Sequence, residues 1–222
     1  MTHCILVRID KKERPKMGTI FGVIVSLFGF VAEPELQTGD IVFQESQSRQ
    51  SKAIREGTNS PITHMGIIHI RKGKPYVYEA VSPVSKPKPY RVGLTPYKSW
   101  VNRGRGKRVW VKRLSENINP LSAKTLKKMQ DVGRRYSGKR YDGLFQWDDR
   151  KIYCSELVFD IYDKAVGVRL GKVQRVKDLN LKPRSVQKLI KARLGKRLNL
   201  NEKIITPVSI FDDPRLITII EP

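Results

Sequence analysis

Cys154 stands where the sequence predicts the first turn of an amphipathic helix. After it, apolar residues recur at positions 157, 158, 161, 162 and 165, which is the spacing of a buried helix face. Unpaired backbone N–H groups and the helix dipole favour a thiolate at that end of a helix. A cysteine in this position is a candidate nucleophile. This stretch alone leaves open a second interpretation, a small buried hydrophobic residue, which is the usual role of a free cysteine.

A nucleophilic thiol needs a base, and a hairpin earlier in the chain offers one. Residues 63–70 and 76–81 have strand patterns, with a turn between them. If the turn has an even number of residues, Glu79 lies opposite Gly66, on the same face as His64 and diagonal to it. A carboxylate in that place fixes the imidazole tautomer and stabilises the imidazolium, so Cys154, His64 and Glu79 form a candidate triad. Taken singly, His64 could also be a hydrogen-bonded histidine at the start of a strand, and Glu79 could be a cross-strand charge partner.

Four other residues are candidates for supporting roles. The backbone N–H of Cys154 is the first expected donor to an oxyanion, because negative charge would develop at the positive end of the helix. Gln44, Tyr141 and Tyr153 are further candidates for substrate or oxyanion contacts, with ordinary packing as the alternative. Glu156, in the first helical turn, is interpreted as stabilising the helix rather than as catalytic.

The sequence contains no pattern typical of a metal or cofactor site. There is no Walker loop, no dinucleotide fingerprint and no paired Cys/His zinc spacing. His64 and His69 have opposite parity along one predicted strand and so point to opposite faces. We therefore expect neither a cofactor nor a metal ion.

The elements that must position these residues are a mixture of strands and helices. Short apolar strands are predicted near residues 41–44, 63–70, 76–81, 109–111 and 216–220, and helices over 51–56, 120–136, 176–181 and 185–194, besides the helix that begins at Cys154. The pattern predicts an α+β fold with a small antiparallel sheet or partial barrel, on which the helix of Cys154 packs.

Residues 1–32 have the pattern of a secretory signal. Five basic side chains precede an apolar run from Gly18 to Ala32. About 15 apolar residues suit a signal peptide, since a spanning helix usually needs about 20. Ala32 fits the last position before cleavage, but Phe30 stands where a small residue is wanted. The pattern predicts export to the periplasm or cell envelope, with residues 1–32 as a cleaved signal peptide or a retained membrane anchor.

Residues 33–222 form the predicted catalytic domain and carry a charge of about +20, because residues 1–32 hold only five of the 44 basic and two of the 21 acidic residues. The stretch 80–115 contains no acid and is predicted to present a surface to anions. In an exported protein, the expected partner is an anionic envelope component, such as peptidoglycan peptide, phospholipid or lipopolysaccharide, rather than nucleic acid. Cys154 would be the only cysteine of the exported form, which favours a buried or functional thiol.

Five motifs occur in a set order, and together they resemble one family. They are Thr38-Gly39-Asp40-Ile41, Thr63-His64-Met65-Gly66-Ile67, Tyr78-Glu79-Ala80, Gly138-Lys139-Arg140-Tyr141-Asp142 and Tyr153-Cys154-Ser155-Glu156-Leu157. In this the chain resembles the YiiX-like branch of the NlpC-type cysteine hydrolases, from Leu36 to Ile220. The resemblance implies a circularly permuted papain-like fold in which histidine precedes cysteine. It also implies Cys154 as nucleophile, His64 as base and Glu79 as orienting residue.

Three functions follow as hypotheses. The first is an exported cysteine amidase that cleaves a peptide or N-acyl bond of the cell envelope through a thioester. The second is a lipid acyl hydrolase or acyltransferase at anionic membranes, since the resemblance includes lipid-processing relatives and the chain is basic. The third is a non-catalytic module that binds the envelope through its positive surface.

Overall fold

The computed structural model describes residues 35–48, 50–81, 91–117, 121–148, 150–193, 195 and 198–222. The predicted signal or anchor segment, residues 1–32, lies outside these ranges. No helix within them is long and apolar enough to span a membrane.

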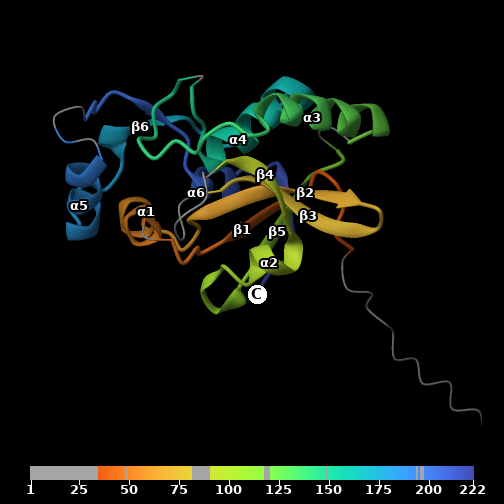
Figure 1. Cartoon of the computed structure of the whole chain (residues 1–222), viewed down its shortest axis with the longest axis horizontal. Helices are drawn as coiled ribbons and strands as arrows, with labels where there is room; N and C mark the ends of the chain where they lie inside the picture. Colours follow the sequence, from red (N-terminus) through yellow and green to blue (C-terminus); the bar gives the residue numbers. More distant parts are fainter. Residues whose placement is uncertain are drawn as a thin grey trace, which may run out of the picture. The chain divides into compact units, whose positions relative to one another are not determined.

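A six-stranded antiparallel sheet is the centre of the fold (Figure 1). Its order is β4-β3-β2-β1-β5-β8, and every neighbouring pair is antiparallel. The strands are β1 (Ile41–Gln44), β2 (His64–Arg71), β3 (Lys74–Ala80), β4 (Val92–Pro96), β5 (Trp110–Leu114) and β8 (Leu216–Ile220). A separate two-stranded sheet pairs β6 (Gln174–Arg175) with β7 (Lys203–Ile204).

Helices cover the sheet and extend one end of the molecule. They are α1 (Ser51–Thr58), α2 (Tyr97–Val101), α3 (Ala123–Tyr136), α4 (Cys154–Ile161), α5 (Arg184–Arg193) and α6 (Pro207–Phe211). A π-helical segment, Tyr162–Val166, continues α4, and 3-10 turns occupy Arg105–Lys107 and Val176–Asp178. In Figure 1, α3 and α4 lie on one side of the sheet and α2 on the other, while α1 and α5 lie next to each other. The α+β prediction is confirmed.

The alternation of side chains along the strands produces a separate core on each face. Ile41 and Phe43 of β1 belong to the larger core, together with α3 and α4, whereas Val42 belongs to a smaller core that includes Trp100 of α2. Leu157 and Val158 of α4 are fully buried, which confirms a buried helix that begins at Cys154. The prediction of an amphipathic helix is wrong, because Glu156 and Phe159, outside the predicted face, are buried as well and only Asp160 is partly exposed. Burial of such faces is the main favourable contribution to folding.

The hairpin of β2 and β3 has the register on which the proposed triad depends. Arg71 pairs with Lys74 and Ile67 with Tyr78, so the turn contains only Lys72 and Gly73. Both turn residues have positive φ, 50° and 71°, as a two-residue hairpin turn of type I′ requires.

The structure departs from the sequence prediction between β3 and β5. Strand β4 and helix α2 were not predicted there, because the prolines of this stretch are unfavourable to a strand. Helix α3 begins at Ala123 rather than at residue 120, with Ser122 as the capping residue. The predicted helix over 176–181 is only a single 3-10 turn.

Candidate active site

Cys154 and His64 meet where a helix and a strand both begin. His64 is the first residue of β2 and Cys154 is the first residue of α4, and their side chains are hydrogen-bonded. The Nε2 atom of His64 lies 2.6 Å from Oε2 of Glu79, which leaves Nδ1 as the nitrogen that faces Cys154. All three side chains are buried, with exposed fractions of 5% or less. The arrangement has the connectivity of a nucleophile, a base and an orienting carboxylate.

Glu79 is held through both of its oxygens. While Oε2 contacts His64, Oε1 accepts hydrogen bonds from Thr95 of β4, at 2.5 Å, and from Nη2 of Arg103. The ring of His64 also lies nearly parallel to that of Trp100, with centroids 6.1 Å apart. The imidazole is therefore fixed from two sides.

The charges of the site support one another. Burial lowers the pKa of His64, but hydrogen bonds to Cys154 and Glu79 and the negative charges of both groups outweigh it and raise that pKa to about 9. Burial raises the pKa of Glu79, and His64, Arg103 and Thr95 together bring it below the ordinary value. Glu79 is thus a carboxylate and His64 an imidazolium at neutral pH.

The first turn of α4 is held in place around Cys154. The carboxyl group of Glu156 accepts the backbone N–H of Tyr153 at 3.4 Å, and Ser155 Oγ donates to the carbonyl of Ile205 at 2.8 Å. Glu156 therefore caps the helix, as expected. Burial raises its pKa to about 9, so it is neutral at pH 7 and adds no negative charge beside the thiol.

Gln44 is a buried amide beside His64. The two residues are paired across β1 and β2, and Gln44 is 1% exposed. A Cβ atom at Gly104 would lie 2.5 Å from Gln44 Oε1, so a larger residue there would require the amide to move. Within the described residues, the buried side-chain polar atoms without a partner are both amide atoms of Gln44, Trp100 Nε1 and Arg103 Nε. Such atoms are rare in native proteins, and here they lie on side chains next to His64 or Glu79.

Tyr141 places a hydroxyl group near Cys154, and hydrogen bonds through Gln50 link that hydroxyl group to α5. Gln50 Nε2 donates to its hydroxyl at 2.5 Å, and Arg193 donates to Gln50 Oε1 at 2.7 Å and to the carbonyl of Gly143 at 3.0 Å. Burial and the neighbouring Cys154 raise the pKa of Tyr141 well above 10. Because the tyrosine accepts from Gln50, its own proton remains free to be donated towards the site.

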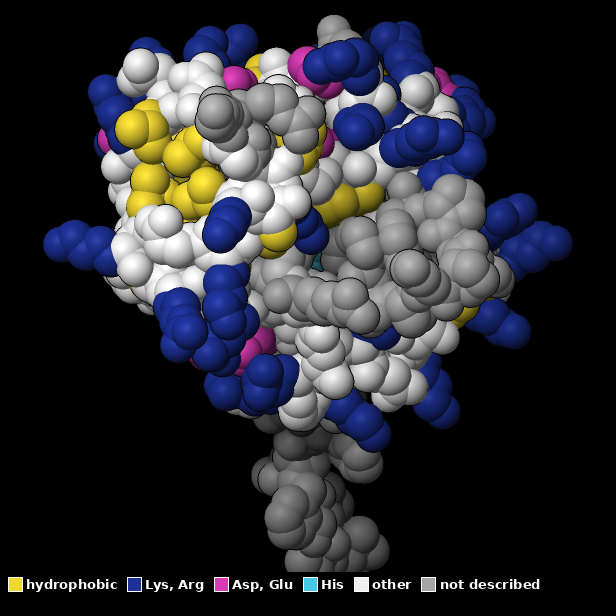
Figure 2. Space-filling model, turned by 60° about the vertical axis from the view of Figure 1, so that its left-hand side comes forward, with side chains coloured by type: hydrophobic (Ala, Val, Ile, Leu, Met, Phe, Trp, Pro, Cys, Tyr) yellow, Lys and Arg dark blue, Asp and Glu magenta, His cyan; other side chains and the backbone are white. Residues whose placement is uncertain are grey.

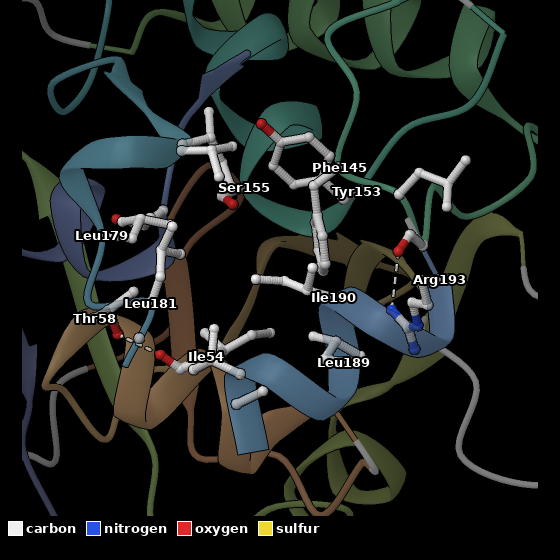
Figure 3. A pocket seen from close by; sticks show the side chains of 18 of the residues that line it. Ile54, Thr58, Phe145, Tyr153, Ser155, Leu179, Leu181, Leu189, Ile190 and Arg193 are labelled. Carbon is white, nitrogen blue, oxygen red and sulfur yellow. Dashed lines mark hydrogen bonds between the residues drawn. The ribbon is translucent and has the colours of Figure 1, made fainter. Parts of the chain in front are cut away.

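Tyr153, a candidate for substrate or oxyanion contacts, lines a pocket. Its hydroxyl accepts the backbone N–H of Ile205 at 3.1 Å, and its ring meets Phe145 edge-on. The pocket reaches Cys154 and has a cavity volume of about 110 Å³. Figure 3 shows side chains of α1, α5 and the intervening loops around it. Its lining is mainly apolar and includes Ile54, Leu179, Leu181, Leu189 and Ile190.

Comparison with known proteins identifies the family. The family model described as "Permuted papain-like amidase enzyme, YaeF/YiiX, C92 family" matches residues 35–220. The chain belongs to this family. It is therefore an enzyme of the papain-like cysteine amidase class, as the motifs predicted, and the permuted papain-like fold is confirmed.

Two relatives are similar over nearly their whole length. YiiX of Escherichia coli (strain K12), which carries the name "Uncharacterized protein YiiX", is 40% identical over 200 residues, covering 90% of this chain and 93% of YiiX. A crystal structure of yiiX from Escherichia coli O157:H7 has a TM-score of 0.76 at 40% identity, covering 84% of this chain and 98% of the other.

That crystal structure is described as one of a "metalloprotein". In the parts of this chain that the structure describes, no three His, Cys, Asp or Glu side chains are grouped so that they could hold a metal ion. Zinc sites usually use three or four such ligands, so the described residues contain no group of that size for zinc.

The structure brings five of the six predicted site residues to the same end of the sheet and adds others that the sequence did not indicate. Cys154, His64, Glu79, Gln44 and Tyr141 adjoin one another, while Tyr153 lines the neighbouring pocket. Additional residues are Thr95, Trp100 and Arg103, which all come from the stretch predicted to face anions. Two of its basic residues, Arg103 and Arg113, pair with carboxylates of the chain itself, Glu79 and, at 2.6 Å, Asp40.

Gly66 lies between His64 and Glu79, and we expect Gly66→Ala to destabilise the protein by about 1–3 kcal/mol through overpacking. A Cβ atom there would collide with Val77 and would lie 2.8 Å from the carbonyl of Tyr78 and 3.2 Å from Cβ of Glu79. Denaturant unfolding measures the effect. Gly93→Ala is the matched control, because Gly93 pairs with Glu79 from the other side and has nothing within 4 Å of its added Cβ. Equal midpoints for the two variants would contradict the packing argument.

Proposed function

We propose that this enzyme cleaves the amide bond of an N-acylated substrate, with Cys154 as nucleophile, His64 as acid and base, and Glu79 as orienting carboxylate. The observation that carries the proposal is the apolar pocket that reaches Cys154. The family gives the reaction class. The pocket indicates which part of the substrate it binds, because an apolar acyl group would be removed from water there.

The reaction proceeds through a thioester. The thiolate of Cys154 attacks the amide carbonyl, and the imidazolium of His64 gives its proton to the leaving amine as the C–N bond breaks. Water then attacks the thioester, giving a proton to His64, and the carboxylic acid and the thiolate are released. Glu79, hydrogen-bonded to Nε2, keeps the imidazole in one orientation through both steps.

Three donors are available for the oxyanion of the tetrahedral intermediate. They are the backbone N–H of Cys154 at the start of α4, the amide of Gln44, which is buried and without a partner, and the hydroxyl of Tyr141. Donors that are already oriented contribute most in a site from which water is excluded. Removing one of them typically costs about 10²–10³-fold in kcat.

The substrate is an anionic component of the cell envelope in this proposal, and the enzyme is exported. Supporting observations are the basic composition and the signal pattern of residues 1–32. Lys and Arg side chains are spread over the face shown in Figure 2, with few Asp or Glu among them. Lys188 and Lys191 are exposed on α5, whose inner side lines the pocket. The same pocket also keeps the lipid acyl hydrolase as a second candidate, since an ester-linked acyl chain would fit equally.

The test is to trap the acyl-enzyme. The protein is incubated with N-acyl amino acids and with phospholipid vesicles, quenched in acid, and the peptide containing Cys154 is weighed. An acyl adduct on Cys154 from the N-acyl substrates supports the proposal. An adduct from phospholipid alone would replace the amidase by the lipid acyl hydrolase, and no adduct from either would contradict both.

Ile190→Trp should shorten the acyl chain that the enzyme accepts. Ile190 lines the pocket from α5, so a larger side chain fills the space an acyl chain would occupy (Figure 3). We expect kcat/KM for a long-chain substrate to fall by about tenfold or more, since a few buried methylene groups are worth about that much. Hydrolysis of an N-acetyl analogue in the same assay is the control. A uniform loss for both substrates would speak against an acyl site here.

A further inference from the structure

Glu79 contacts a second cation, Arg103, in addition to His64. One carboxylate oxygen faces His64, and the other accepts from Arg103 and Thr95. Glu79 is fully buried, whereas the side chain of Arg103 is 26% exposed. The imidazole and the guanidinium therefore contact different oxygens of the carboxylate, and Arg103 is the more exposed of the two cations.

The segment that carries Arg103 is tied to the rest of the site. The backbone N–H of Arg103 donates to the carbonyl of Trp100 at 3.1 Å, and the backbone carbonyl of Arg103 accepts the N–H of Gln47 at 3.2 Å. Trp100 lies beside the ring of His64, and the next residue, Gly104, adjoins the amide of Gln44. One short segment thus contacts Glu79, His64 and Gln44.

Negative and positive groups alternate along the line of contacts through the buried site. In the reactive form, the thiolate of Cys154 is followed by the imidazolium of His64, the carboxylate of Glu79 and the guanidinium of Arg103. With Arg103 these four charges sum to zero, and without it the site carries a buried negative charge. Burying an uncompensated charge is costly, and a carboxyl group escapes that cost by taking up a proton.

We infer that Arg103 is a positioning residue: it keeps Glu79 ionised and directed at His64, so that the working unit of the enzyme has four members. The inference rests on the proposed roles of Cys154, His64 and Glu79. Among the described residues, charged or titratable groups that act on His64 and Glu79 include Cys154 from α4 and Arg103 from the segment after α2, and Tyr141 adjoins Cys154.

The test uses the reactivity of Cys154 and needs no substrate. Alkylation of the full chain by iodoacetamide is followed by mass spectrometry between pH 5 and 9, in wild type, Arg103→Met and Arg103→Lys. Loss of a cation beside a carboxylate raises the pKa of that carboxylate, and a protonated Glu79 no longer stabilises the imidazolium that accompanies the thiolate. For Arg103→Met we therefore expect the acid limb of the alkylation profile to move to higher pH by about one unit, which is about a tenfold slower reaction at a pH on that limb. Arg103→Lys retains the charge and should recover at least half of that loss on a logarithmic scale.

Arg105→Met is the matched control. Arg105 lies two residues away and pairs with a different carboxylate, that of Glu45, at 2.9 Å, so its loss should leave the profile unchanged. If Arg103→Met does not fold, Arg103→Gln keeps a donor to Glu79 without the charge and should be slowed in the same way. Identical profiles for Arg103→Met or Arg103→Gln and wild type, or equal slowing in the Lys variant, would overturn the role of Arg103. A wild-type Cys154 no more reactive than glutathione would instead count against the proposed function.

Discussion

Replacing Cys154 by alanine should abolish turnover while the protein stays folded. Without the sulfur no thioester can form, and loss of the nucleophile in comparable hydrolases costs about 10⁴–10⁶-fold in kcat. The side chain is small and buried, so the stability cost should be about 1 kcal/mol. Hydrolysis of an N-acyl substrate and thermal unfolding, measured on the same preparation, check both statements.

The adjacent Ser155 provides the control for Cys154→Ala. Ser155→Ala removes a hydrogen bond to the carbonyl of Ile205 and is expected to cost about 1 kcal/mol of stability with little effect on the chemical step. Unaltered turnover in Cys154→Ala would exclude the thioester mechanism. Binding of the substrate to that variant should persist, because the pocket is intact.

Replacing His64 by glutamine should have the second largest effect, with kcat falling by about 10²–10⁴-fold, the usual contribution of a general acid or base. It should also change the pH dependence of stability. The pKa of His64 is raised from 6.5 to about 9. The folded protein therefore binds more protons than the unfolded chain between these values. This contribution is fully present below pH 6.5 and is lost by about pH 9, and its size is ~3 kcal/mol.

Glu156 must be separated from His64 in that experiment. Its raised pKa, about 9 in place of 4.5, also makes the folded protein bind extra protons, so its contribution declines with rising pH in the same direction. Denaturant unfolding of wild type, His64→Gln and Glu156→Gln at pH 6 and pH 9 resolves the two. In His64→Gln, the free energy of unfolding should decline less between pH 6 and pH 9 than in wild type. The decline that remains should be the part due to Glu156. A decline as steep as in wild type would contradict the ion pair.

The hairpin shows how much of the site was predictable from sequence. Side-chain alternation and a two-residue turn were sufficient to place Glu79 on the same face as His64, because both rules act over a few residues. The helix of Cys154 was predictable for the same reason. Gln44 could be nominated, but its pairing with His64 depends on the register between β1 and β2.

The contacts of Arg103 could not be predicted in this way. A basic residue in a basic stretch has no local signal for turning inwards, and its partner precedes it by 24 residues. The pocket was hidden for a different reason. Ile54, Leu179 and Ile190 come from separate segments, and each has the pattern of an ordinary core residue. Whether apolar side chains fill a space or surround one depends on the three-dimensional arrangement.

The link from α5 through Arg193 and Gln50 to Tyr141 gives the pocket a second consequence. The helix that would touch the acyl tail also helps to orient the hydroxyl beside Cys154. Binding of an acyl tail in the pocket would therefore help to orient the Tyr141 hydroxyl group at the reacting carbonyl. Substrates with truncated tails would then react slowly even at saturation. In such an enzyme the far end of the substrate decides how fast the bond at the near end is broken.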